Sequence, residues 1–328
     1  MWPAEGEPYL GRTNLLRRRL LRMWRLLQAR HPIARIEYFF TGSKLEASVR
    51  LYELAKFHFP RRYGDVARLR LPPFVKIVLG NPFPRSHITS QIGRSTARYF
   101  GPFRTRLSAE RFESALLDLF QVRRCQEDLI PSPQHPGCMY GEMGMCLRPC
   151  QQVVGPEEYA SEVYRLTEFL ATGGRSLLDP AAAARDRLSA EMQFEEAARQ
   201  HRRLEKIGEV LKLRDEMARD IDRLHGVAVT ASAEPDAVEL SFVRAGHWQG
   251  TTRICFDQVS LDRKLHNAVD DVSATVWKPK ERQEYLAILA RWFYSSWRDG
   301  EFLLFDTFDN VPYRKLVGAI SRVAKATA

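Results

Sequence analysis

Residues 125–150 read CQEDLIPSPQHPGCMYGEMGMCLRPC and hold four of the five cysteines of the chain. The four thiols stand at Cys125, Cys138, Cys146 and Cys150, with twelve, seven and three residues between them. Proline and glycine recur throughout this stretch, and they favour a tight, irregular loop in which four thiolates can converge. The sequence therefore predicts a four-cysteine metal site. Cys255 lies in a segment with a strand pattern, and we expect it to be an ordinary buried residue.

The spacing of these cysteines leaves the identity of the metal open. The stretch lacks the paired Cys-x2-Cys units of zinc ribbons, yet four soft ligands suit zinc and an iron–sulfur cluster alike. Buried cysteines without a metal are a third interpretation, disfavoured because thiols are rarely gathered in such a loop without one. The odd number and close clustering of the cysteines argue against a secreted disulfide framework.

Length and composition limit the remaining possibilities. The 328 residues suffice for two or three modest domains, and the formal net charge of +10 favours polyanionic partners such as nucleic acid. No run of eighteen apolar residues occurs, so no membrane span is predicted. The first residues, MWPAEGEPYLGR, lack the basic and apolar regions of a secretory signal. A cytoplasmic protein is expected.

Residues 8–36 contain no acidic side chain, while arginines alternate there with leucines. This pattern predicts an amphipathic basic helix. One interpretation is a DNA-contacting face made of Arg17, Arg18, Arg22 and Arg25. The alternative is a solvated cationic surface whose leucine stripe packs on a core.

Periodicity, capping signals and turn residues along the rest of the chain predict an α+β multidomain protein. The expected helices cover residues 43–56, 107–120, 156–170, 181–223 and 281–297, with a last one from residue 313. The expected strands are IEYFF (36–40), FVKIVL (74–79), the alternating segments VAVTA, AVELSFVRAG and WQGTTRICFDQV, in which Gly246 and Gly250 flank a hairpin turn, and residues 301–305. The expected domains are 1–103, 104–179, 180–220 and 221–328.

Three motifs together resemble the middle of UvrC, a subunit of the bacterial excinuclease. They are RYFGPF (98–103), the cysteine stretch ending in CLRPC (146–150), and EEY (157–159). The resemblance implies a nucleotide-excision-repair protein that binds DNA and whose family activity is incision of damaged DNA. It also implies that Cys125, Cys138, Cys146 and Cys150 hold a [4Fe-4S] cluster.

The segment EMQFEEAARQHRRL (191–204) is similar to the UVR motif, a helical hairpin through which UvrC joins UvrB and, through it, UvrA. The resemblance implies a contact face made of Phe194, Ala197, Ala198 and Leu204. The alternative is a charged surface helix. Residues 238–250 and 286–294 resemble the small α/β region that leads into the UvrC C-terminal nuclease, so we expect the RNase H-like catalytic part to be absent.

The N-terminal segment resembles a GIY-YIG nuclease, an α/β domain. Tyr9-Leu10-Gly11 stands at the YIG half of the motif, Arg12 follows it, and Arg19 falls at the essential arginine. The resemblance implies that the tyrosine helps to activate water, the arginine stabilises phosphate charge, and a glutamate holds Mg²⁺. The strand carrying the GIY half is expected to be missing, unless the start at Met1 was assigned too late.

Leu51 occupies the position of that metal-binding glutamate, and leucine cannot ligate Mg²⁺. Glu46 and Glu53 lie nearby in sequence, but Glu53 points about 200° round the helix, so neither is expected to replace the missing ligand. Two functions follow from the resemblance. One is an active repair endonuclease, and the other is a degenerate subunit that binds DNA and UvrB without cutting.

Overall fold

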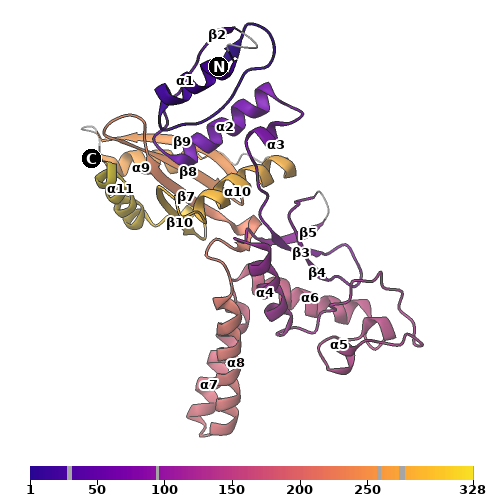
Figure 1. Cartoon of the computed structure of the whole chain (residues 1–328). Coiled ribbons are helices and arrows are strands. Elements are labelled where there is room, and N and C mark those ends of the chain that lie inside the picture. The colour runs from indigo at the N-terminus through magenta and orange to yellow at the C-terminus, as the bar shows by residue number, and fades with distance from the viewer. Residues whose placement is uncertain (28–31, 94–95, 257–259, 273–277, 328) are drawn as a thin grey trace. The chain divides into compact units, whose positions relative to one another are not determined.

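The computed structural model describes residues 1–27, 32–93, 96–256, 260–272 and 278–327 (Figure 1). These residues form two compact units. The first unit comprises Met1–Arg70, His225–Val276 and Glu284–Ala328, and the second comprises Leu71–Leu224 and Trp277–Gln283. Helices and three antiparallel sheets make up the described chain, which confirms the α+β class. No described helix is long and apolar enough to cross a membrane.

A four-stranded antiparallel sheet forms the centre of the first unit. Its order is β10 (Gly300–Phe305), β7 (His225–Ala231), β8 (Ala237–Arg244) and β9 (His247–Cys255). Strands β7, β8 and β9 fall where alternation predicted them, and β10 falls where a short strand was expected; the last predicted strand positions, 257–259, lie outside the described residues. The β8–β9 turn has positive φ at its two residues, whereas Gly250 lies within β9 beside a bulge and does not flank the turn.

Helices cover both faces of this sheet. On one face, α9 (Leu261–Asp270) and α11 (Tyr313–Thr327) share an apolar core with the strands. On the other face, Trp248 of β9 stacks on Tyr285 of α10 (Pro279–Phe293), with ring centroids 5.7 Å apart. Tyr285 in turn meets Tyr52 of α2 edge-on at 5.2 Å. The sheet therefore supports α2, the helix that carries Leu51.

Helix α2 (Lys44–His58) begins where the Thr-Gly-Ser sequence predicted. The Ser43 hydroxyl accepts a hydrogen bond from the Glu46 N–H at 3.0 Å, and the Glu46 carboxylate accepts one from the Gly42 N–H at 2.7 Å. Gly42 lies so close to the end of β7 that a Cβ atom on it would stand 2.2 Å from the carbonyl carbon of Ser232. A short helix, α3 (Tyr63–Val66), follows.

The N-terminal segment contains less regular structure than the sequence suggested. Strands β1 (Trp2–Pro3) and β2 (Ile33–Arg35) pair, and α1 covers Leu16–Leu27, a part of the predicted basic helix. The expected strand at residues 36–40 is wrong, since IEYFF has no regular structure and its side chains are exposed. A short apolar run in a sequence does not show whether another strand is available to pair with it.

The second unit contains an antiparallel sheet with the order β4 (Ser86–Thr89), β3 (Phe74–Val78), β5 (Ala97–Gly101) and β6 (Arg219–Asp220). Helices α4 (Arg106–Leu117) and α6 (Pro156–Ala171) share its apolar core. The two phenylalanines of the RYFGPF motif lie in this core, whereas its Tyr99 is buried elsewhere, edge-on to Phe74. Phe100 stacks on Phe112 of α4 with ring centroids 5.2 Å apart, and Phe103 lies 5.4 Å from the same ring.

The compact units divide the chain after residues 70, 224, 276 and 283, whereas the sequence suggested boundaries at 103, 179 and 220. Strands β3 to β5 share their core with α4 and α6, so they group with the cysteine region and not with residues 1–70. The stacking of Phe100 on Phe112 is the physical reason, because it joins the strand and the following helix in one core.

Helices α7 (Arg175–Ala190) and α8 (Phe194–Lys212) form a helical hairpin that overlaps the predicted helical region 181–223. The hairpin begins before residue 181, and the expected helix beyond Lys212 is wrong, since residues 219–223 form β6 and a 3-10 turn. Ile207 and Val210 of α8 are buried in the core of the second unit. Phe194, at the opposite end of α8, is exposed, so one end of the hairpin is anchored and the other meets solvent. The remaining short helices are α5 (Met139–Glu142), η1 (Pro149–Gln151), η2 (Ile221–Arg223) and η3 (Phe308–Asn310).

We expect Gly42→Ala to lower the free energy of unfolding by about 1–3 kcal/mol, because the added methyl group meets the backbone of Ser232. Urea unfolding followed by circular dichroism measures this change. Gly64→Ala is the matched control, since no atom lies within 4 Å of a Cβ built at Gly64. Equal stability of the two variants would contradict the prediction.

Candidate nucleic-acid site and cysteine loop

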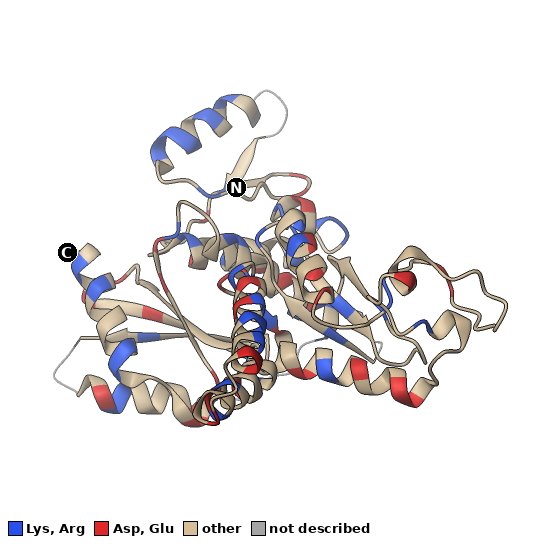
Figure 2. Cartoon of the chain, turned by 90° about the horizontal axis from the view of Figure 1, so that it is seen from below, with Lys and Arg blue, Asp and Glu red and all other residues tan. Residues whose placement is uncertain are grey.

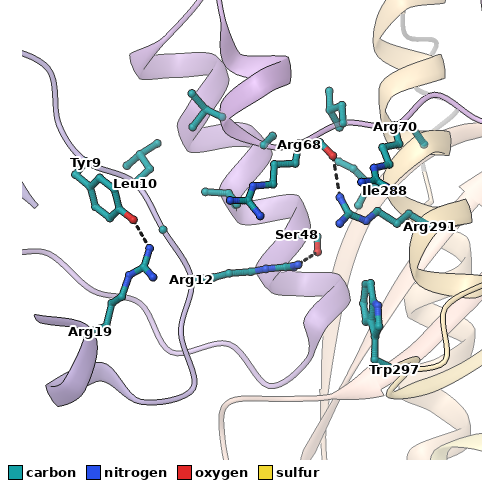
Figure 3. Close-up of a pocket in the computed structure, with 16 residues that line it drawn as sticks. Tyr9, Leu10, Arg12, Arg19, Ser48, Arg68, Arg70, Ile288, Arg291 and Trp297 are labelled. Atoms are coloured by element: carbon teal, nitrogen blue, oxygen red, sulfur yellow. Dashed lines mark hydrogen bonds between the residues drawn. The ribbon is translucent and has the colours of Figure 1, made fainter. Parts of the chain in front are cut away.

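The first unit contains a cavity of about 280 Å³ that gathers the residues predicted from the GIY-YIG resemblance (Figure 3). Tyr9, Arg12, Arg19 and Leu51 all line it. Tyr9 and the two arginines come from the N-terminal segment and α1, whereas Leu51 comes from α2. The structure therefore brings together residues that span more than forty positions of the sequence.

Hydrogen bonds fix two of the arginines in this cavity. The Arg19 guanidinium donates to the Tyr9 hydroxyl, and its Nε is buried with no hydrogen-bond partner. The Arg12 guanidinium donates to the Ser48 hydroxyl at 2.7 Å, and that hydroxyl donates to the Lys44 carbonyl at 2.6 Å. Each arginine is thus held through a neutral oxygen and not through a carboxylate.

Three further arginines line the cavity and were not singled out from the sequence. They are Arg68 and Arg70, which follow α3, and Arg291 of α10. Arg291 donates to the Arg68 carbonyl at 2.8 Å. Burial lowers the pKa of Arg291, and the charges of Arg12, Arg70 and Arg68 lower it further. No sequence signal pointed to Arg291, because more than 200 residues separate it from the N-terminal motif.

No carboxylate is found among the described residues that line this cavity. Glu46 and Glu53 line another cavity of about 340 Å³, together with Glu239 and Arg253. Burial is the main cause that raises the pKa of Glu46 and of Glu53. Neither glutamate lines the cavity that Leu51 lines, and the expectation that neither replaces the missing ligand stays a prediction.

A third, more apolar cavity shares four lining residues with the first cavity, namely Tyr9, Arg12, Arg19 and Leu51. Glu37 is its one carboxylate among the described residues, and that carboxylate lies 2.8 Å from the guanidinium of Arg35. Mg²⁺ requires oxygen ligands, and in proteins these are usually carboxylates. Arginines and a carboxylate already paired with a cation do not fit a Mg²⁺ site.

Helix α1 presents the arginines expected to contact DNA. Arg17, Arg18, Arg22 and Arg25 are all exposed, and the helix carries no acidic residue (Figure 2). Met23 is buried, whereas Leu21 and Trp24 are about half exposed. Only part of the apolar stripe is therefore buried, and the exposed arginines fit both a DNA-contacting face and a solvated cationic surface.

The four clustered cysteines lie in one loop of the second unit. Cys146 and Cys150 are buried, Cys125 is half-buried, and Cys138 is exposed at the start of α5. Cys150 lies in η1, and its carbonyl accepts a hydrogen bond from the Ser132 N–H at 2.9 Å.

Cys255 is exposed at the end of β9, so the expectation of a buried residue is wrong. Ile254 beside it points into the core, and the alternation of the strand turns Cys255 outward.

The thiols influence one another electrostatically. Burial raises the pKa of Cys146, and the neighbouring Cys125, Cys138 and Cys150 raise it further. The Arg148 N–H donates to the Cys146 sulfur at 3.4 Å, and an Arg123 N–H donates to the Cys125 sulfur at the same distance. Across the described ranges, no three His, Cys, Asp or Glu side chains are grouped closely enough to hold a metal ion. Four soft sulfur donors with N–H groups directed at two of them nevertheless fit the donor set of an iron–sulfur cluster.

The beginning of this loop is fixed to the core by two buried side chains. Arg123 is 4% exposed and donates to the carbonyls of Phe83 and Glu127, at 2.9 Å each. The Tyr159 hydroxyl accepts from the Arg123 N–H at 2.9 Å and donates to the Pro84 carbonyl at 2.8 Å. Tyr159 is the tyrosine of the EEY motif, so the structure gives this motif a physical role as an anchor of the cysteine loop.

The hairpin places the four predicted partner-binding residues in different environments. Phe194 is 66% exposed, and Ala198 is exposed as well. Leu204 is half-buried, and Ala197 is buried. The side chains available to a partner are therefore Phe194 and Ala198.

Comparison with known proteins agrees with these observations. Residues 73–169, which contain the RYFGPF motif, the cysteine loop and most of α6, match the family described as UvrC/Cho excinuclease, middle domain. The UvrABC system protein C of Lachnospira eligens is 26% identical over 254 residues, which are 74% of this chain. Over most of its length the chain is similar to UvrC proteins.

Two further UvrC relatives come from other bacteria. The UvrABC system protein C of Moorella thermoacetica is 28% identical over 65% of this chain, and that of Desulforudis audaxviator is 30% identical over 54%. The matches cover 41%, 35% and 28% of the three UvrC proteins, so the chain spans well under half the length of these relatives. No solved structure matches the chain.

Proposed function

We propose that this chain is a DNA-binding factor of nucleotide excision repair that holds DNA at the arginine-lined cavity and does not cut it there. The observation that carries the proposal is the lining of that cavity. Tyr9, Arg12 and Arg19 meet further arginines, and Leu51 stands where the resemblance places a metal-binding glutamate. The name of the relatives, UvrABC system protein C, supports the repair role.

Arginines and a carboxylate contribute differently to phosphodiester cleavage. Arginine stabilises charge on a phosphate group, whereas a carboxylate holds the metal ion that lowers the pKa of a bound water molecule. The cavity supplies arginines that can stabilise phosphate charge, and its described lining contains no carboxylate to hold a metal ion. These residues are suited to binding a phosphate group and not to activating water.

One observation favours cutting as a second candidate function. Glu37 lines the neighbouring apolar cavity together with Tyr9 and Arg19. Release of Glu37 from Arg35 would give that cavity a free carboxylate. An assay for incision of a damaged duplex separates the two functions.

With purified UvrA and UvrB, Mg²⁺ and a lesion-bearing duplex, we expect the chain to bind the duplex without nicking it. Binding should weaken steeply as salt rises, because the arginines displace counterions from the phosphates. Denaturing gel electrophoresis measures nicking, and fluorescence anisotropy measures binding. Nicking that is lost in both Arg19→Ala and Glu37→Gln, yet kept in the exposed control Arg314→Gln, would establish the second candidate instead.

The cysteine loop is proposed to hold a [4Fe-4S] cluster through Cys125, Cys138, Cys146 and Cys150. When bound, the cluster would cross-link the loop through four Fe–S bonds and so stabilise it. Arg123 and Tyr159 would keep the start of the loop in place for that binding. The role assigned to the cluster is structural, since these cysteines lie in the second unit and the arginine-lined cavity lies in the first.

After anaerobic purification, we expect about four iron and four sulfide per chain and a broad visible absorption band, all lost in Cys146→Ser because that change removes a thiolate ligand. Metal analysis and absorption spectroscopy make the measurement. Cys255→Ser is the matched control, since Cys255 lies outside the loop. Stoichiometric zinc without sulfide would overturn the iron–sulfur proposal.

The α7–α8 hairpin is proposed to bind UvrB through its exposed end. Phe194→Ala should weaken capture of UvrB roughly tenfold or more, since an exposed aromatic anchor of an interface contributes about 2 kcal/mol. Surface plasmon resonance with immobilised UvrB measures the affinity. The control Phe57→Ala removes a ring that is 79% exposed on the first unit. Equal loss in both variants, or in neither, would contradict the assignment.

A further inference from the structure

We propose that Arg12, Arg68, Arg70 and Arg291 form a pocket that binds a phosphate group of nucleic acid. This inference rests on the proposed function and adds to it, because Arg68, Arg70 and Arg291 belong to none of the motifs that indicated a nuclease. The ligand class is a phosphate ester, either an internal phosphodiester or a phosphorylated strand end.

The geometry brings these arginines together from three separate segments. Arg12 precedes α1, Arg68 and Arg70 follow α3, and Arg291 lies on α10. The hydrogen bond from Arg291 to the Arg68 carbonyl ties α10 to the segment after α3. An arginine has five N–H donors, so this one bond orients Arg291 while leaving it donor capacity toward the cavity.

Aromatic and hydroxyl groups hold Arg12 in the cavity. Its guanidinium donates to Ser48 of α2 and lies 5.9 Å from the ring centre of Trp297 (Figure 3). The same ring is approached by Lys44 Nζ at 5.8 Å. Arg12 is therefore positioned before any ligand arrives, which lowers the entropy cost of binding an anion.

The charges in the pocket are unbalanced. Across the described lining, five arginines meet no carboxylate. The mutual repulsion is visible at Arg291, whose pKa is lowered by burial and then by Arg12, Arg70 and Arg68. A bound anion relieves this repulsion, and the planar guanidinium fork matches the oxygens of phosphate. The concave shape of the site selects a group that projects from its carrier, as a phosphate does from a nucleic-acid strand.

The experiment compares the full chain with Arg70→Gln and Arg291→Gln, and Arg314→Gln of α11 is the control. Arg70 and Arg314 are both exposed, so their replacement leaves the fold intact. The first readout is the melting temperature in inorganic phosphate and in chloride at equal ionic strength. The second is duplex affinity as a function of salt, with 5′-phosphorylated and 5′-hydroxyl ends.

We expect inorganic phosphate to raise the melting temperature of the wild type and of Arg314→Gln, and to have at most half that effect on Arg70→Gln and Arg291→Gln. For the duplex, the slope of log affinity against log salt should fall by about 0.9 for each pocket arginine removed. A loss confined to 5′-phosphorylated duplexes would identify a strand end as the ligand. An equal loss with both kinds of end would identify an internal phosphodiester.

Two results separate this inference from the proposed function. If Arg70→Gln and Arg291→Gln bind duplex and inorganic phosphate as Arg314→Gln does, the phosphate pocket is overturned and the DNA-binding function stands. If the wild type responds to inorganic phosphate through these arginines but has no affinity for duplex, the pocket stands and the DNA-binding function fails.

Discussion

The rotation of helix α2 is the constraint on which the candidate site depends. Gly42 lies against the backbone at the end of β7, and the buried Tyr52 hydroxyl donates to Glu284 of α10 at 2.7 Å. These two contacts fix which side chains of the helix face each cavity. Ser48 and Leu51 meet the arginines, whereas the glutamates of the same helix face away from them. Glu46 and Glu53 therefore cannot reach Tyr9 without unpacking the helix.

The arginine-lined cavity then follows from this arrangement. A neutral wall of Ser48 and Leu51 leaves the charge of the surrounding arginines uncompensated. Arg19 and Arg291 are half-buried, and their desolvation and the mutual repulsion of the five arginines cost free energy that a bound anion would offset. This imbalance connects the leucine at position 51 to the proposed recognition of phosphate. One cavity thus accounts for both parts of the proposed function.

The second unit depends on a different kind of contact. Its cysteine loop has little regular structure, and buried polar side chains hold its first residues. Arg123 and Tyr159 satisfy the carbonyls of the segment at residues 83–84, which precedes β4. Because these groups lie in the core formed by RYFGPF, α4 and α6, the loop is attached to a rigid support. Attachment of this kind is what a structural cluster requires of its protein.

Local features of this protein follow from its amino-acid sequence. The helix start at Ser43, the strands β7 to β10, the four-cysteine set and the leucine at position 51 could all be read from it. The tertiary structure determines which residues meet, because packing brings distant segments together. It added Arg291 to the cavity across more than 200 residues, and it left IEYFF without a strand partner. It also buried Ala197 within the hairpin and exposed Cys255, since burial depends on neighbouring elements that periodicity does not specify.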